Sequence, residues 1–284
     1  MRYRFLRFPE GKTKAVTFSY DDGFADDLQL IEILNRYGLK GTFNLYNALF
    51  HNKGEYLQLA DIHSLLDAGH EIAVHGVNHT ALGKCTPLEG IQEVLGNRLA
   101  LEKTFGRIVQ GYAYADGGVR TVISGTTRES ICRYLQDLGI VYARTFGGDN
   151  DRFPLPENWY NWVPTAHHEN PELDAYMAKF LALDVNGQYE SNRDPRLFFL
   201  WGHSREFTQN NNWDRAERIC KTLGSHKDIW YATCIEIYQY VNAYNQLVFS
   251  ADGTLVYNPT LFTIWFDIDG KLYAITPGET KKLP

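Results

Sequence analysis

The chain has 284 residues, a formal net charge of −6 and an ordinary share of charged residues, 22%. This length suits one large α/β domain with a small addition, and it buries enough surface to fold without disulfides or a structural metal. The acidic balance excludes a broad nucleic-acid-binding surface, which would need clustered Lys and Arg.

Cysteine usage and hydropathy indicate where the protein resides. The cysteines, at positions 85, 132, 220 and 234, form no C-x-x-C pair, so reduced core thiols are expected. Residues 1–8 are basic but have no apolar segment behind them, and no run of 18 apolar residues occurs. These features predict a cytoplasmic protein without a membrane partner.

Strand-like and helix-like segments alternate through most of the chain. After a strand-like start and a turn at residues 9–11, strands are expected at residues 14–19, 40–45, 71–75, 109–114, 140–145, 159–165, 197–201 and 229–232. Helices are expected between and after them, at residues 26–37, 59–68, 87–105, 128–138, 171–183, 213–223 and 234–246. Repeated strand–helix units predict a parallel sheet in an α/β fold, and this number of units favours a barrel.

The pattern changes after residue 247. Residues 255–257, 261–267 and 271–275 alternate apolar and polar side chains, with a turn at residues 267–270. We therefore expect a barrel over residues 1–246 and an antiparallel β-hairpin or small sheet over residues 247–284 that packs on the barrel.

Acidic and imidazole side chains follow three of the predicted strands. Asp21 and Asp22 end the first, His75 and His79 follow the third, and His203 follows a later one. The carboxyl ends of barrel strands meet at one rim, which is where such barrels place their active sites. One Asp with two His suits zinc, and also iron, cobalt, nickel or manganese, while the adjacent acid stays free to handle a proton.

These motifs resemble those of a known family. F-S-Y-D-D-G at residues 18–23 resembles the T-F-D-D-G motif of polysaccharide deacetylases, the NodB-like group of carbohydrate esterase family 4. H-G-V-N-H at residues 75–79 looks like the family's H-[ST]-x-x-[HD] motif, and L-W-G-H at residues 200–203 looks like its L-x-H motif. The resemblance covers residues 14 to about 245 and implies a distorted (β/α)7 barrel.

The resemblance also implies a role for each residue. Asp21 would be the general base and His203 the general acid. The metal ligands would be Asp22, His75 and His79. Further residues near the rim are candidates for contact with the substrate or its oxyanion: Tyr114, Asp116, Trp162 and His168.

The third family motif departs from the usual R-x-P-Y. Residues 111–117 read G-Y-A-Y-A-D-G, with Ala113 at the Arg position and Asp116 at the aromatic position. Asp21 would thereby lose a neighbouring cation, for which Arg144 or Arg205 could substitute because both follow predicted strands.

The fourth family motif, D-x-x-D-W, is absent at its usual spacing. His167 and His168 lie after the neighbouring strand, where they could line the cleft, orient His203 or simply form loop surface. An aromatic wall could be supplied by one of four tryptophans: Trp159, Trp162, Trp201 and Trp213.

The leading hypothesis is a metal-dependent hydrolase that removes N- or O-linked acetyl groups from a carbohydrate. One alternative is an amidohydrolase that acts on a non-sugar, cyclic amide. The other is a protein that binds sugar or metal without catalysis, which the altered third and fourth motifs would allow.

Overall fold

The computed structural model describes residues 3–52, 54–123, 125–146 and 151–284. Within these ranges the main sheet has the strand order β6-β5-β4-β3-β2-β8-β7, and β9 pairs with the first part of β2. Its strands are β2 (Lys14–Asp22), β3 (Gly41–Leu45), β4 (Glu71–Val74), β5 (Gly111–Ala113), β6 (Tyr142–Arg144), β7 (Ala166–His167), β8 (Arg196–Gly202) and β9 (Ile229–Tyr231). Every pairing in this sheet is parallel.

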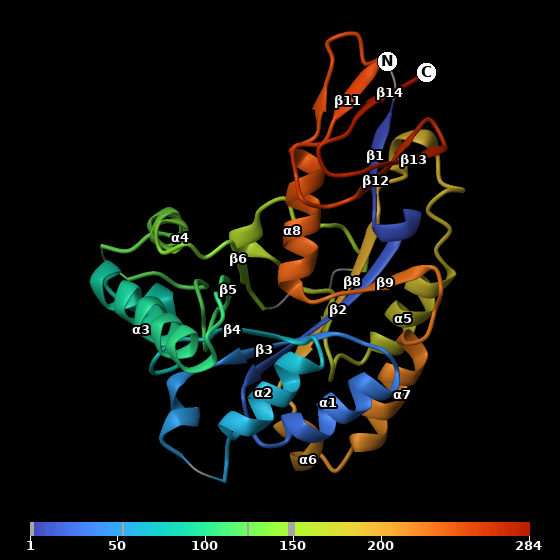
Figure 1. The fold of residues 1–284 in the computed structure, drawn as a ribbon. Helices are drawn as coiled ribbons and strands as arrows, with labels where there is room; N and C mark the ends of the chain where they lie inside the picture. The colour runs from blue at the N-terminus through green and yellow to red at the C-terminus, as the bar shows by residue number, and fades with distance from the viewer. Residues whose placement is uncertain (1–2, 53, 124, 147–150) are drawn as a thin grey trace.

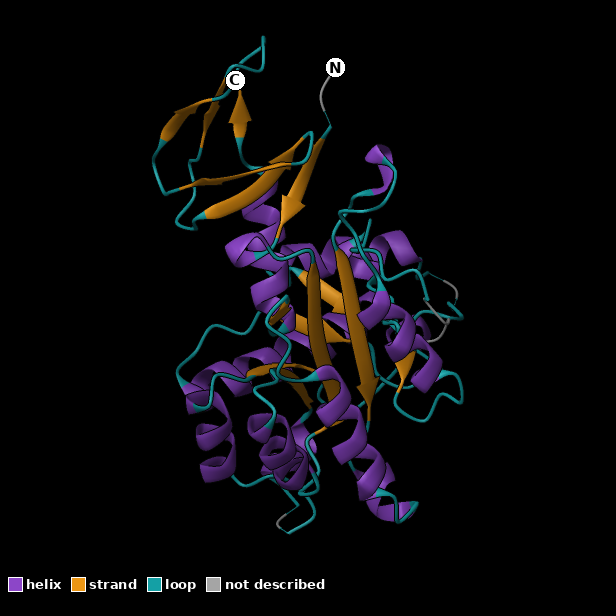
Figure 2. Ribbon diagram, turned by 90° about the vertical axis from the view of Figure 1, so that its right-hand side faces the viewer, coloured by secondary structure: helices purple, strands orange, loops and turns teal. Residues whose placement is uncertain are grey.

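Helices follow most of the strands and cover the sheet (Figures 1 and 2). They are α1 (Asp27–Arg36), α2 (Leu59–Asp67), α3 (Pro87–Phe105), α4 (Arg128–Asp137), α5 (Leu173–Ala182), α6 (Arg205–Gln209), α7 (Trp213–Leu223) and α8 (Cys234–Asn245). Local sequence explains several starts: Thr86 and Thr233 each form a capping box with the Glu three residues later. No described helix combines the length and apolarity that a membrane crossing requires.

The expected distorted α/β barrel is confirmed, because the parallel path runs from β6 to β7 as a half-barrel. One predicted strand is wrong. Residues 159–165 contain a 3-10 turn at Trp159–Asn161 instead, and the strand comes later, at Ala166–His167. Pro164 explains part of this, since it has no N–H to donate to a ladder.

The C-terminal segment forms two small antiparallel sheets. One contains β10 (Val248–Phe249), β11 (Leu255–Tyr257) and β14 (Thr280–Lys282), and the other joins β12 (Ile264–Ile268) and β13 (Lys271–Ile275) to the N-terminal β1 (Arg4–Arg7). The two ends of the chain accordingly lie near each other (Figure 1). A domain boundary at residue 246 stays a prediction, but the first strand pairs with the segment beyond it.

One core joins these sheets to the barrel. Leu6 and Phe266 from the small sheets pack in the same buried cluster as Phe199 of β8 and Ile237 of α8. The two longest strands of the main sheet, β2 and β8, point away from the small sheets in Figure 2. The carboxyl end of β2, with Asp21 and Asp22, therefore lies at the opposite end of the barrel.

Candidate active site

Asp21 is buried at the carboxyl end of β2, between the strands on either side. Asn44 of β3 stands opposite it in register and donates a 2.7 Å hydrogen bond from Nδ2 to its Oδ1. The guanidinium of Arg144, at the end of β6, donates from Nη2 to Oδ2 at 2.5 Å. The side chains of Arg144 and Asp21 are 1% and 4% exposed, so the ion pair is shielded from water.

Of the two cations that could substitute for the missing third-motif Arg, Arg144 is the one that contacts Asp21. Arg205 is not at this position: it binds Glu55 at 2.7 Å and lies over the Phe24 ring. β5 and β6 are adjacent parallel strands with Ala113 opposite Arg144, so the cation has moved one strand along the sheet.

Asp22, His75 and His79 form the predicted three-ligand cluster. Oδ1 of Asp22 lies 3.5 Å from Nε2 of His75 and 3.2 Å from Nε2 of His79. Their ligand atoms all lie within 4.8 Å of one another, which allows them to hold one metal ion. Asp22 and His79 have positive φ values of 79° and 56°, an uncommon conformation that tends to occur at functional sites.

The surrounding backbone prepares His75 for a metal. Its Nδ1 lies 2.9 Å from the carbonyl oxygen of Ala113, so Nδ1 carries the proton and Nε2 keeps its lone pair. The backbone N–H groups of His75 and Gly76 both donate to Oδ1 of Asn97, at 2.9 and 3.2 Å. These bonds fix the loop that follows β4.

The charge state of the cluster also fits a metal. Burial alone would raise the pKa of Asp22, but the nearby imidazoles of His75 and His79 lower it below its ordinary value. Asp22 is therefore ionised. Asp22 Oδ1 and His75 Nε2 are buried and have no hydrogen-bond partner among the described residues, which is costly unless a ligand such as a divalent cation satisfies them.

His203, just after β8, faces Asp21 from the other side of the site. Its Nε2 lies 3.9 Å from Oδ2 of Asp21, and its Nδ1 lies 3.2 Å from Oε1 of Glu206. Burial lowers the pKa of His203, but the Glu206 hydrogen bond and the charges of Asp21 and Asp22 outweigh it and raise the pKa to about 9.

Glu206 is a residue that the sequence hypothesis missed. Its Oε2 lies 3.2 Å from Nε2 of His167 and 3.0 Å from Nε2 of His168. The sequence does contain an indication of this contact. Glu206 follows His203 by three residues at the start of α6, a spacing that lets side chains meet. His168 therefore contacts the partner of His203, one of the roles suggested for it.

Three other predicted site residues, Tyr114, Trp162 and Asp116, make contacts elsewhere. The Tyr114 side chain is buried and its backbone N–H donates to the Arg144 carbonyl at 3.0 Å, so that N–H is unavailable to an oxyanion. Trp162 is 1% exposed in the second core cluster, against Tyr142 and Phe199, which leaves it no surface for a substrate. Asp116 is exposed and lies 3.8 Å from Lys84.

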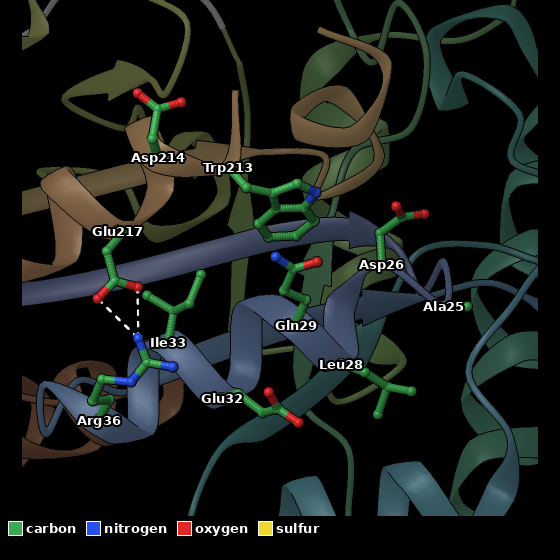
Figure 3. A pocket seen from close by; sticks show the side chains of 10 residues that line it. All are labelled: Ala25, Asp26, Leu28, Gln29, Glu32, Ile33, Arg36, Trp213, Asp214 and Glu217. Atoms are coloured by element: carbon green, nitrogen blue, oxygen red, sulfur yellow. Dashed lines mark hydrogen bonds and ion pairs between the residues drawn. The ribbon is translucent and has the colours of Figure 1, made fainter. Parts of the chain in front are cut away.

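Trp201 is the tryptophan that lies next to the site. Its half-buried ring is 4.6 Å from the Arg144 guanidinium and 5.9 Å from the His203 ring. Trp213 instead lines a groove of about 760 Å³ between α1 and α7 (Figure 3), beside Gln29 and Asp26. The predicted base, acid and metal ligands are not among the residues that line that groove.

Comparisons with known proteins bear on the family and on the fold. The family model described as polysaccharide deacetylase matches residues 9–143. Among solved structures, a putative polysaccharide deacetylase from Mycobacterium smegmatis aligns with a TM-score of 0.56 and 18% identity, over 86% of this chain and 96% of that chain. That likeness supports the fold. A search of curated proteins finds no match.

Two further structures align less closely. A family 4 carbohydrate esterase from Streptomyces lividans, in complex with acetate, gives a TM-score of 0.48 at 16% identity, over 77% of this chain and 92% of that chain. The deacetylase PplD from Streptococcus pyogenes, also with acetate, gives 0.42 at 20% identity over 46% of this chain. The chain spans 55% of PplD.

The matched segment contains Asp21 and the three-ligand cluster of Asp22, His75 and His79. Arg144, His203 and Glu206 lie beyond it, and the fold brings them to the same rim. The family model's match over residues 9–143 and the parallel half-barrel show that this chain resembles the polysaccharide deacetylase family in sequence and in fold.

Proposed function

We propose that the chain is a metal-dependent deacetylase that hydrolyses an N- or O-linked acetyl group on a carbohydrate. The observation that carries this proposal is the placement of Asp21. Its carboxylate lies beside the Asp22, His75 and His79 cluster and 3.9 Å from His203, so a metal site, a base and an acid share one rim.

Asp22, His75 and His79 would hold the metal, with zinc as the first choice for two imidazoles and a carboxylate. Cobalt, nickel, iron and manganese accept the same ligands. When bound, the metal supplies Lewis acidity toward the acetyl carbonyl and toward water.

Asp21 is proposed as the general base. Its Oδ1 and Oδ2 accept hydrogen bonds from Asn44 and Arg144, which hold the carboxylate in one orientation. It takes a proton from water as the water oxygen attacks the acetyl carbon. The backbone N–H of Asp116 has no hydrogen-bond acceptor among the described residues, and we propose it as a donor to the oxyanion.

His203 is proposed as the general acid. Its raised pKa keeps Nε2 protonated, on the side of the ring that faces Asp21. As the bond between the acetyl carbon and the leaving group breaks, Nε2–H protonates the leaving amine or alkoxide, and acetate is the second product. General acids and bases each contribute about 10²–10⁴-fold to such reactions.

The test starts with metal analysis of the purified full chain and acetate release from acetylated chito- and xylo-oligosaccharides. We expect one equivalent of metal and metal-dependent acetate release. Turnover of cyclic amides without acetate release would select the amidohydrolase alternative. Metal binding without turnover of either panel would select the non-catalytic alternative.

Asp21→Asn tests the division of labour between the two acids. The amide cannot accept the proton, so we expect metal content to be unchanged and turnover to fall at least about 10²-fold. Asp67→Asn, which changes an exposed carboxylate on α2, is the control and should match wild type. Loss of metal from Asp21→Asn would show that Asp21, too, is a ligand.

A further inference from the structure

Three imidazoles surround one carboxylate beside the proposed acid. Oε1 of Glu206 is 3.2 Å from Nδ1 of His203, while Oε2 is 3.2 Å from Nε2 of His167 and 3.0 Å from Nε2 of His168. These groups come from three places: β7 and the residue after it, the residue after β8, and α6. The position of the protons on the three imidazoles decides what this carboxylate can do.

Hydrogen bonding identifies which nitrogen of His167 carries the proton. Nδ1 of His167 accepts the backbone N–H of Glu169 at 3.2 Å, so the proton of the neutral ring is on Nε2, which faces Glu206. A metal at His167 Nε2 would have to displace that proton and break the bond to Glu169. A hydrogen bond from His167 to Glu206 therefore explains this contact better than a bound metal ion does.

His168 anchors the other side of the carboxylate. It is 0% exposed, with its ring stacked at 4.1 Å on Phe207 and at 5.7 Å on Tyr20. Burial lowers the pKa of His168, so it is neutral and holds Glu206 without bringing another charge. Glu206 is ionised: burial would raise its pKa, but the nearby imidazoles of the three histidines lower it below its ordinary value.

We propose that Glu206, clamped by His167 and His168, is a positioning residue that holds the proton of His203 on Nδ1 and directs Nε2 into the active site. This inference rests on the proposed function for its catalytic consequence. With Oε2 held by His167 and His168, Oε1 accepts Nδ1–H of His203. The other ring nitrogen then faces Asp21 and serves as the acid.

Glu206→Gln breaks this arrangement while keeping the shape of the side chain. The amide has one acceptor oxygen and one NH2 group, so it cannot accept from His203 and also from His167 and His168. With zinc-loaded full-length protein we expect kcat to fall about 100-fold with KM changed less than about 2-fold. Glu206→Asp should recover part of the loss.

The pH profile separates positioning from structural damage. Charged or titratable groups face His203 from every side: Asp21 and Asp22 from β2, His79 after β4, His167 from β7 and Glu206 from α6. Without Glu206 the acid loses its proton at lower pH, so the alkaline limb of kcat should move to lower pH. The control is Glu169→Gln, a carboxylate of similar exposure that is 3.7 Å from His168 and should leave the profile unchanged.

A second readout does not depend on turnover. Ring ¹⁵N NMR at about pH 10, where the His203 ring is neutral, should show Nδ1–H in wild type and in Glu169→Gln, and loss of Nδ1–H or its exchange with the Nε2–H tautomer in Glu206→Gln. An unchanged tautomer and kcat in Glu206→Gln would overturn the proposal, as would loss of a second zinc equivalent from that variant. If wild type releases no acetate, the proposed function fails and the NMR comparison alone decides the link. If Glu206→Gln does not fold, Glu206→Asp decides it.

Discussion

The pairing of Arg144 with Asp21 shows how one residue can replace another from a different strand. The family's usual Arg position holds Ala113, yet a guanidinium still reaches the carboxylate, from the next strand along the sheet. Both partners are almost fully buried. Coulomb attraction in such surroundings is stronger than at the surface, but it depends on both charges being present.

Arg144→Met should therefore impair both stability and turnover. It leaves the Asp21 carboxylate buried without its cation, and we expect the free energy of unfolding to fall by about 3–5 kcal/mol in urea titrations. Arg205→Met removes a cation from an exposed pair with Glu55 and should cost less than about 1 kcal/mol. Equal effects of the two variants would show that the buried pair contributes nothing special.

Adjacent elements bring the histidine cluster together. β7 and β8 run parallel with His167 opposite Trp201, so the residues after both strands emerge side by side. Gly202 makes this packing close: a Cβ there would lie 2.1 Å from Nδ1 and 2.9 Å from Cγ of His168. The missing side chain at position 202 lets His168 lie against β8 and reach Glu206.

Gly202→Ala tests this contact between elements. The added methyl must displace the His168 ring, and overpacking of this kind costs about 1–3 kcal/mol of stability. We expect a lower melting temperature together with reduced kcat, measured by calorimetry and acetate release. Gly106→Ala, at a helix end where nothing lies within 4 Å, is the control for kcat, which should stay intact; its φ of +62° means that the alanine lowers stability there without touching the site. Unchanged kcat in Gly202→Ala would mean that His168 can shift without effect.

Across the whole molecule, a buried carboxyl ties the sheet to the last helix. Glu71 of β4 accepts hydrogen bonds from Tyr142 of β6 at 2.7 Å, from Thr42 of β3 at 2.8 Å and from the Ile235 N–H of α8 at 2.9 Å. Burial raises the pKa of Glu71 to about 7, although these hydrogen bonds partly oppose the shift.

This carboxyl should make stability depend on pH. The folded state keeps its proton up to about pH 7, whereas the unfolded state loses it near 4.5, so its contribution to stability falls as pH rises between these values. The full loss is about 3 kcal/mol. The neighbouring His70 has its pKa lowered to about 4 by burial and acts in the opposite direction, so the prediction concerns a difference between proteins.

Glu71→Gln removes the titrating group. The stability of wild type relative to Glu71→Gln should decline between pH 4.5 and 7 and stay level above that range, as measured by urea unfolding at each pH. A constant difference across the range would mean that Glu71 is ionised in the folded protein at pH 4.5.

Sequence reasoning identified the parallel α/β architecture and the residues that gather at one rim, because strand ends and their neighbours in sequence are local properties. Asp22, His75 and His79 follow from this, since a parallel sheet must bring the ends of β2 and β4 to the same edge. The roles of these residues remain proposals. For the cation near Asp21, the sequence left Arg144 and Arg205 as equal candidates.

Only the tertiary structure could separate those candidates, because the choice depends on which side chain packs inward across two strands. The same holds for Glu206, whose contacts with His167 and His168 join residues about 40 positions apart. It also holds for Trp162, which sequence could place near the rim but whose ring packs in the core. The position of each strand along the chain is a local property of the sequence, whereas burial and side-chain partners are decided by packing between distant segments.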